Sequence, residues 1–475
     1  MKKTIVVAAL LLSIGAALEA KVTLPSVISD NMVLQQQTDA ALWGLAEPGK
    51  KVTVKASWTN AKTVVTADSR TGKWLVRIAT PSAGGPYEIS ISDGEAVTLK
   101  NVLVGEVWFC SGQSNMEMPM RGYGSQPAKG AVDYILAAKA STPIRVCNIS
   151  RKSSKTPLEV SEGSWEQNTP DAVAGTSATA YYFAQKLQSV IDVPVGIIVT
   201  CWGGSSIETW IGREYIEKEF PEFSLKHLTP EGEIRGANQD PCLCFNGQVA
   251  PLVPYTFKGM IWYQGETNRG RPDQYIRLQD AYTRFMRETF AVPDAPFYFV
   301  QIAPYPYGKP DDFCSGYFYE AQQKSLDVIA HSGMAVTCDV GEYGTIHPCQ
   351  KEAVGHRLAY LALQHDYGCT AICADAPTYK SVEFRDGGAI VNFNVDQCGL
   401  SPMGVDLPGF EIAGSDKVFH PAKARFASGS SVSVSSPDVP EPVAVRYCFR
   451  NWCYGALYNN YGVPAAPFRT DDWEL

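Results

Sequence analysis

Four short segments of the sequence carry the side chains from which a hydrolytic site could be built. They read Ser-Gly-Gln-Ser-Asn-Met at 111–116, Trp-Gly-Gly-Ser-Ser at 202–206, Gln-Gly-Glu-Thr-Asn at 264–268 and Ile-His-Pro at 346–348. Together they supply hydroxyls, side-chain amides, flexible backbone donors and an imidazole. Each segment alone is typical of a turn that follows a strand. Four of them, each after or close behind an apolar run, indicate a shared site.

This set of groups suits acyl transfer. A serine hydroxyl is a poor nucleophile until a base takes its proton, and histidine is the usual base near neutral pH. The negative charge that develops on the carbonyl oxygen needs preorganised hydrogen-bond donors. Glycines let the backbone present its N–H groups at close range.

The segments that must position these groups alternate between apolar runs and helical patterns over residues 101–370. The spacing predicts helices around 180–191, 278–285 and 354–362. It predicts strands at Val102–Phe109, Val195–Thr200, Gly259–Trp262, Phe297–Ile302 and Met334–Cys338. Alternation of this kind implies an α/β core whose mainly parallel sheet is covered on both faces, with ligands bound beyond the carboxyl ends of the strands.

The flanking segments have β character. Residues 21–100 contain short runs of alternating apolar and polar residues separated by Gly- and Pro-rich turns, and residues 371–475 return to the same pattern. We expect both flanks to be sandwich-like β regions. The 475 residues therefore divide into about three parts.

Several motifs resemble the sialate O-acetylesterases, a branch of the SGNH hydrolases. The resemblance rests on Cys110–Met116, Trp202–Glu208, Ile261–Asn268 and Ile346–Pro348. It also includes Lys21–Ser26, Asp30–Gln35 and Pro467–Trp473, so it covers nearly the whole chain after residue 20. It implies an SGNH-hydrolase-like three-layer core.

The resemblance also implies roles for individual residues. Ser114 matches the nucleophile and His347 the general base. The N–H of Ser114, the N–H of Gly204 (or Gly203) and the side-chain amide of Gln264 match the oxyanion hole.

The sequence departs from the family pattern at one place. Many SGNH enzymes carry an aspartate three residues before the histidine, where this chain has Gly344, and Thr345 is not acidic either. Glu342 or Asp339 could orient the imidazole, or a backbone carbonyl could do so. A Ser-His dyad is therefore as well supported as a triad.

Other assignments of the same residues remain open. Ser111 is a second hydroxyl beside the motif, and Glu266 with Glu117 could form an acid/base carboxylate pair as in a glycosidase. We favour a supporting role for both carboxylates. Arg269 and Arg271 could bind a substrate carboxylate bidentately or could be solvated side chains at a helix start. The remaining histidines lie in a helical pattern or outside any comparable motif: His227, His331, His356, His365 and His420.

Composition excludes several classes of function. The net charge is −8 with no long run of like charges, which disfavours nucleic-acid binding.

Residues 1–20 have a basic start, a short apolar core and a small-residue end, as in a secretory signal peptide. We therefore expect an exported, periplasmic or extracellular protein without a membrane span.

The thirteen cysteines include the local pairs Cys369/Cys373 and Cys448/Cys453, which could form disulfides in an exported protein. The sequence contains no Cys-x-x-Cys pair, which disfavours a structural zinc site.

The resemblance implies a serine esterase that removes O-acetyl groups from sialic acid, with the 9-O-acetyl group as the expected position, through an acetyl-enzyme intermediate. It implies no metal and no organic cofactor. One alternative is an acetylesterase for another carbohydrate such as acetylxylan. The other is an inactive glycan-binding protein. The sequence leaves the oligomeric state open.

Overall fold

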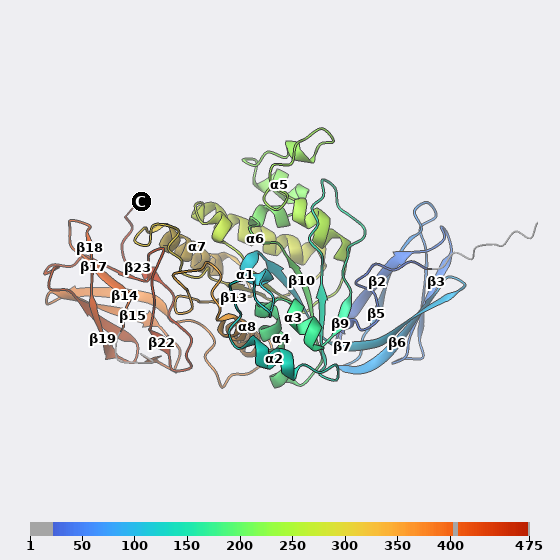
Figure 1. The fold of residues 1–475 in the computed structure, drawn as a ribbon, viewed down its shortest axis with the longest axis horizontal. Coiled ribbons are helices and arrows are strands. Elements are labelled where there is room, and N and C mark those ends of the chain that lie inside the picture. Colours follow the sequence, from blue (N-terminus) through green and yellow to red (C-terminus); the bar gives the residue numbers. More distant parts are fainter. Residues whose placement is uncertain (1–21, 402–406, 474–475) are drawn as a thin grey trace, which may run out of the picture.

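The computed structural model describes residues 22–401 and 407–473, so the predicted signal peptide lies outside the described residues. Three parts follow one another along the long axis of the molecule (Figure 1). A β region formed by the first strands lies at one end, a mixed α/β part lies in the centre, and a second β region formed by the last strands lies at the other end.

The central part contains a parallel sheet with one antiparallel edge strand, in the order β13-β12-β11-β7-β10-β8-β9. These strands are β7 (Ala96–Gly112), β8 (Ile144–Asn148), β9 (Trp165–Gln167), β10 (Val195–Cys201), β11 (Gly259–Tyr263), β12 (Phe297–Val300) and β13 (Ser332–Ala335). The middle strands β7, β10 and β11 are buried along their paired length because helices cover the sheet.

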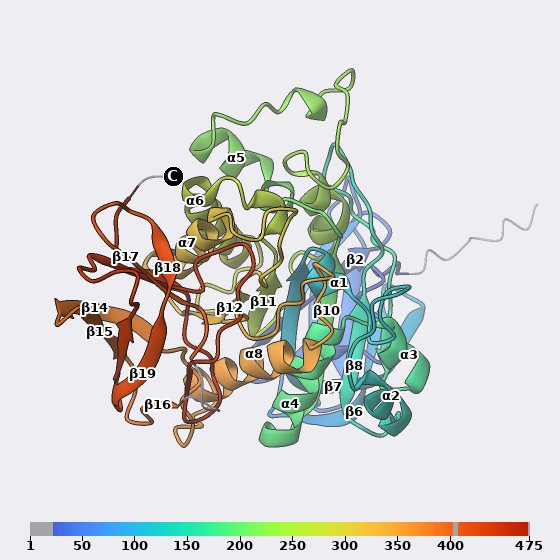
Figure 2. The same ribbon diagram turned by 60° about the vertical axis from the view of Figure 1, so that its left-hand side comes forward.

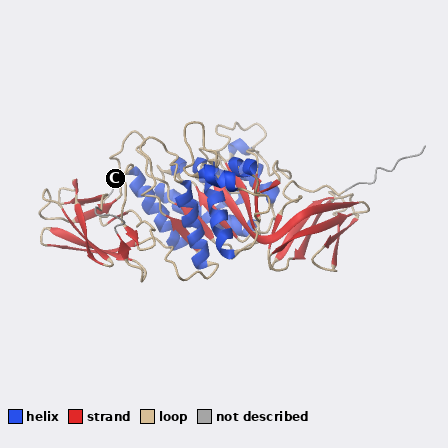
Figure 3. Cartoon of the chain, turned by 60° about the horizontal axis from the view of Figure 1, so that its bottom comes forward, coloured by secondary structure: helices blue, strands red, loops and turns tan. Residues whose placement is uncertain are grey.

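Helices cover both faces of this sheet (Figure 3). On one face α4 (Ala178–Ile191) packs against α8 (Lys351–His365), and the two lie side by side in Figure 2. On the other face α6 (Pro272–Thr289) packs against α7 (Cys314–Val328). Adjacent residues of β7 point into the two layers, since Trp108 contacts Phe183 of α4 and Phe109 contacts Phe290 just after α6. The shorter helices are α1 (Ser114–Glu117), α2 (Ala131–Ala137), α3 (Pro170–Gly175) and α5 (Arg213–Glu219).

Strand β7 belongs to both the first β region and the central sheet. Its first half pairs with β6 and β1, and its second half pairs with β10 and β11. The expected boundary at residue 100 therefore falls inside one continuous strand. The other strands of this region are β1 (Val33–Gln35), β2 (Asp39–Leu45), β3 (Lys51–Ala56), β4 (Lys62–Thr66), β5 (Lys73–Ala79) and β6 (Gly84–Ser92).

The last β region contains two four-stranded antiparallel sheets, β14-β15-β20-β19 and β18-β17-β21-β23. Phe393 on the first sheet packs edge-on against Phe468 on the second, as in a sandwich. The strands are β14 (Thr378–Arg385), β15 (Gly388–Asn394), β16 (Leu400–Ser401), β17 (Phe410–Ala413), β18 (Phe419–Pro421), β19 (Lys423–Ser428), β20 (Ser431–Ser435), β21 (Ala444–Tyr447), β22 (Tyr458–Asn459) and β23 (Phe468–Arg469).

The mixed α/β class, the three expected helices and four of the five expected central strands are confirmed, whereas the strand expected at Met334–Cys338 lies earlier, at Ser332–Ala335. The expected disulfides are not. All thirteen cysteines lie in the described residues and all are free, including Cys369, Cys373, Cys448 and Cys453. Within residues 22–401 and 407–473 we find no helix with the length and apolar character that a bilayer crossing requires.

Candidate active site

Ser114 lies at the carboxyl end of the central strand, where β7 ends and α1 begins. The turn requires glycine at 112, because φ there is +150° and a Cβ would lie 2.2 Å from the carbonyl oxygen of Tyr263 on β11. Ser114 is half-buried, as a nucleophile reached by substrate must be. Ser111 is only 1% exposed, and its hydroxyl donates to the Thr200 carbonyl at 2.8 Å, which leaves it a structural role.

The glycine loop after β10 lies directly against Ser114. A Cβ on Gly203 would lie 3.4 Å from the Cβ of Ser114. The Gly203 N–H donates to Glu117 Oε2 at 2.9 Å, and the Gly203 carbonyl accepts from Asn238 Nδ2 at 2.7 Å. That carbonyl belongs to the same planar peptide unit as the Gly204 N–H, so Asn238 also orients this N–H. Among the described residues the Gly204 N–H has no acceptor, which leaves it available to an oxyanion.

Gln264 differs from its expected role. Its side chain is fully buried, and its Nε2 donates to the Ser205 carbonyl at 3.0 Å and to Asn268 Oδ1 at 2.7 Å. The Asn268 amide cannot turn over, because its oxygen also accepts from the Ile207 N–H and its nitrogen donates to Glu208. Both amide protons of Gln264 are therefore committed, and this arrangement gives it none for an oxyanion. Gln264 instead ties the loops after β10 and β11 together.

His347 is oriented by a residue that the sequence analysis did not single out. Its Nδ1 lies 2.6 Å from Oε1 of Gln126, and its ring packs edge-on against Tyr123 with 5.3 Å between the centroids. Because an amide oxygen can only accept, Nδ1 carries the proton and Nε2 has the free lone pair that a general base needs. Burial, together with the nearby Lys351 ammonium, lowers the pKa of His347 to about 4.

Neither acidic residue considered as the partner of His347 reaches it. Asp339 forms a bidentate ion pair with the Arg357 guanidinium at 2.8 and 2.5 Å. Glu342 accepts the backbone N–H of Cys349 at 2.7 Å. The expectation that Glu342 or Asp339 orients the imidazole is corrected on these grounds, since the acceptor is the neutral side chain of Gln126.

Tyr123 and Asn115 bring the nucleophile and the base together. Tyr123 donates its hydroxyl to the Ser114 carbonyl at 3.0 Å while its ring contacts His347. The amide of Asn115 donates to the carbonyl of Ile346, next to His347, at 3.1 Å. The side chains of Ser114 and His347 are not hydrogen-bonded to each other, and catalytic hydrogen bonds of this kind commonly tighten only when substrate binds.

The comparisons with known proteins decide the family. Residues 104–362 match the family model described as a carbohydrate esterase, sialic acid-specific acetylesterase. The chain belongs to this family. It is therefore a carboxylic ester hydrolase whose substrate class is an acetylated carbohydrate.

Similar proteins cover nearly all of this esterase. Sialate O-acetylesterase from Mus musculus is 26% identical over 93% of the chain and 93% of that protein. The Homo sapiens protein of the same name is 27% identical over 93% of the chain and 91% of its own length. The solved structure of a carbohydrate acetylesterase from Xanthomonas citri is 34% identical, with a TM-score of 0.85 over 95% of this chain and all of that one.

The two arginines of the esterase have different surroundings. Arg271 is paired with Glu208 at 2.7 Å, so its charge is already balanced. Arg269 donates to Asn451 Oδ1 at 2.9 Å and lies 3.8 Å above the ring of Tyr307. No carboxylate of residues 22–401 or 407–473 pairs with Arg269, which makes it the better candidate for binding an anionic group.

Glu117, Glu266 and three of the other histidines have structural partners. Glu117 accepts from Gly203 and from Arg151 Nε at 2.5 Å, and Glu266 accepts from Asn115 at 2.6 Å. Both carboxylates hold loops, as we favoured. His227 contacts the Pro241 carbonyl, His331 contacts Asp366 and His365 contacts Asp375. His356 lies within α8 and His420 within β18. No group of His, Cys, Asp and Glu in the described parts of the chain could hold a metal ion.

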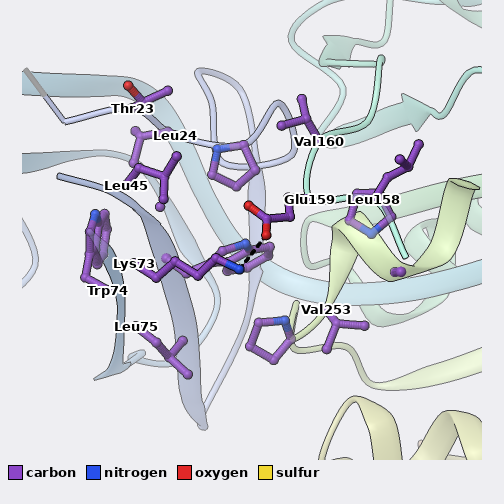
Figure 4. Close-up of a pocket in the computed structure, with 16 residues that line it drawn as sticks. Thr23, Leu24, Leu45, Lys73, Trp74, Leu75, Leu158, Glu159, Val160 and Val253 are labelled. Carbon is purple, nitrogen blue, oxygen red and sulfur yellow. Dashed lines mark hydrogen bonds and ion pairs between the residues drawn. The ribbon is translucent and has the colours of Figure 1, made fainter. Parts of the chain in front are cut away.

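A cavity of about 410 Å³ lies away from these residues, between the first β region and the central part (Figure 4). Leu45 and Leu75 line one side, Leu158 and Val253 line the other, and an ion pair between Lys73 and Glu159 crosses it. None of the predicted site residues lines this cavity.

Sequence reasoning missed Gln126, Tyr123 and Lys351. Gln126 and Tyr123 lie in an irregular loop after α1, where no periodicity marks a residue. Lys351 is the first residue of α8, a position at which a lysine is ordinarily a solvated side chain. The one available signal was proximity in sequence to the Ser114 and His347 motifs.

Proposed function

We propose that this protein is an exported sialate O-acetylesterase that removes O-acetyl groups, the 9-O-acetyl group foremost, from sialic acid. The observation that supports the proposal is that Tyr123 contacts both Ser114 and His347, while the Gly204 N–H beside them has no acceptor among the described residues. The relatives from Mus musculus and Homo sapiens are both named sialate O-acetylesterase, and each matches this chain over nearly its whole length. Residues 1–20 would be the export signal, 21–100 and 371–475 the flanking β regions, and 101–370 an SGNH-type catalytic part.

The reaction follows from these groups. Ser114 Oγ attacks the acetyl carbonyl carbon as its proton passes to His347 Nε2. The resulting oxyanion accepts from the N–H groups of Ser114 and Gly204, neither of which has another acceptor among the described residues. His347 then protonates the departing sugar oxygen, which leaves an acetyl-Ser114 ester. Water attacks this ester while His347 takes its proton, and His347 then returns that proton to Ser114 Oγ as acetate leaves and the free enzyme is restored.

The dyad form of this mechanism is the one we propose. Gln126 fixes the His347 tautomer but carries no charge. It therefore offers the transient imidazolium less stabilisation than an aspartate would. The lowered pKa of His347 keeps the imidazole neutral, and so able to accept a proton, over most of the physiological range.

Arg269 is the residue that we propose binds the sialic acid carboxylate. It follows the loop that contacts Gln113, since the N–H groups of Gly265 and Thr267 donate to Gln113 Oε1. A guanidinium without a carboxylate partner is suited to bidentate recognition of that group. Acetylxylan has no such carboxylate, so the two substrates should respond differently to the loss of Arg269.

The test compares acetate release from O-acetylated sialosides, acetylxylan and p-nitrophenyl acetate. We expect Ser114→Ala to lower kcat at least ~10³-fold on every active substrate, with Ser111→Ala far less affected. Arg269→Met should raise KM for the sialoside ~10-fold or more and leave p-nitrophenyl acetate unchanged. Turnover by the folded Ser114 variant close to that of the wild type would refute the serine mechanism. Faster release from acetylxylan would refute the sialic acid assignment.

A further inference from the structure

Lys351 is a charged side chain that the proposed mechanism does not use. It begins α8, four residues after His347, and none of its surface is exposed. Its Nζ lies 2.5 Å from Asn115 Oδ1 and 5.3 Å from the centroid of the Tyr263 ring. Burying an ammonium is costly unless it is hydrogen-bonded and electrostatically balanced, so its retention here calls for an explanation.

The partner of Lys351, Asn115, connects three parts of the site. It follows Ser114 directly, and its Nδ2 donates to Glu266 Oε1 at 2.6 Å and to the Ile346 carbonyl at 3.1 Å. An ammonium can only donate, so it requires the oxygen of the Asn115 amide on its own side. The nitrogen must then face Glu266 and Ile346. Lys351 thereby sets the orientation of a side chain that hydrogen-bonds across from the Ser114 segment to the His347 segment.

We propose that Lys351 is a positioning residue of the esterase site, which acts through Asn115 to hold the segments of Ser114 and His347 in their relative place. The inference rests on the proposed function, because it assigns Lys351 to the same Ser-His site.

The charges around Lys351 are consistent with this role. Glu266, Glu342 and Cys349 face its ammonium, and His347 is close enough to feel its charge. Burial lowers the pKa of Lys351 to about 7, whereas Glu266 and Glu342 oppose that shift. In return the ammonium contributes to the low pKa of His347. Removing the Lys351 charge should therefore raise the pKa of His347.

The first experiment is Lys351→Met, which keeps most of the side-chain length and removes the charge and the donor. We expect kcat to fall ~10–10²-fold with KM changed less than ~3-fold, because misplaced reacting groups reduce turnover more than binding. We also expect the acid limb of kcat/KM against pH to move to higher pH. A merely structural lysine would not move that limb.

Lys186→Met is the matched control. Lys186 also lies near a half-buried histidine, His356, whose pKa burial and Lys186 lower to about 4. The same change of charge there should leave both kcat and the acid limb unaltered. Circular dichroism and the thermal midpoint establish that each variant is folded.

Glu266→Gln tests the proposal without altering Lys351. A glutamine oxygen can still accept from Asn115, but the loss of the carboxylate lowers the pKa of Lys351 further, since Glu266 raises it. The ammonium is then lost at a lower pH. The ratio of variant activity to wild-type activity should therefore be lower between about pH 6 and pH 8 than it is below about pH 6.

These outcomes separate the inference from the proposed function. If Ser114→Ala is inactive while Lys351→Met keeps wild-type kcat and an unmoved acid limb, the positioning role is refuted and the esterase mechanism stands. If Ser114→Ala stays active, the proposed function is refuted. If Lys351→Met does not fold, the Glu266→Gln variant is the deciding test. A loss of activity in Glu266→Gln that is the same at every pH would overturn the inference.

Discussion

At the scale of single residues, the distinctive feature of the site is that the His347 Nδ1–H donates to an uncharged amide and not to a carboxylate. Gln126 supplies orientation, while Asp339 and Glu342 are committed to Arg357 and to the Cys349 N–H. The position that is acidic in many SGNH enzymes is Gly344, and a Cβ there would meet no atom within 4 Å. The geometry thus favours a dyad whose base is kept neutral by burial.

Substitutions at Gln126 test this account. Gln126→Ala should lower kcat ~10–10²-fold by releasing the imidazole. Gln126→Glu should instead place a carboxylate beside His347, favour the imidazolium and raise the His347 pKa from about 4, so that the acid limb of kcat/KM moves to higher pH. Glu342→Gln is the control, with an expected loss below ~10-fold. A loss there equal to that of Ser114→Ala would identify Glu342 as a third triad member and contradict the dyad.

At the scale of elements, the site depends on how closely the ends of adjacent strands approach. Strands β7, β10 and β11 lead into the Ser114 turn, the glycine loop and the Gln264 loop. Gly112 pairs with Cys201 on one side and Tyr263 on the other, so the three loops begin at one level of the sheet. The absence of a side chain at Gly112 is what permits the approach to β11.

We expect Gly112→Ala to be costly for both stability and activity. Its Cβ would lie 2.2 Å from the Tyr263 carbonyl oxygen, so β7 and β11 must separate and displace Ser114 two residues later. The substitution should lower the free energy of unfolding by ~1–3 kcal/mol or more and reduce kcat. Gly175→Ala at the end of α3, where a Cβ meets no atom within 4 Å, is the control. Thermal midpoints and kcat values that match between the two variants would contradict this account.

At the scale of the whole molecule, both β regions are joined to the central part by more than a linker. Strand β7 runs through the first region into the central sheet. The second region contacts α7, where Asn451 accepts from the Ser315 N–H at 2.9 Å and Arg469 pairs with Glu320 at 3.0 Å. Asn451 also accepts from Arg269, so this region reaches the candidate carboxylate-binding residue.

A fragment of residues 101–370 should therefore be insoluble or weakly active. The cut would fall within β7, leave its remaining residues 101–105 without their partners β6 and β1, and expose the face of α7 that the last β region covers. Residues 21–475 serve as the reference protein. Solubility and specific activity per mole are the measurements, and a soluble fragment with full activity would show that the flanks are independent appendages.

The sequence by itself determined the class of the fold and the motifs of the site. Apolar runs such as Val195–Thr200 and helical patterns such as that of α4 are local, because burial imposes a period on each element separately. The same holds for the serine, glycine and histidine segments, which follow their strands along the chain. Their order was enough to place them at one edge of a parallel sheet.

Only the tertiary structure decided which groups are free to act. Gln264 and Gln126 are both glutamines in loops, yet Asn268 and Ser205 occupy the donors of the first, whereas the second accepts from His347. From the sequence alone, Lys351 is expected to be a solvated side chain at the start of a helix. The structure instead places Asn115, which is 236 residues away in the chain, at its ammonium. Hydrogen-bond partners at such separations are set by packing, and no local pattern records them.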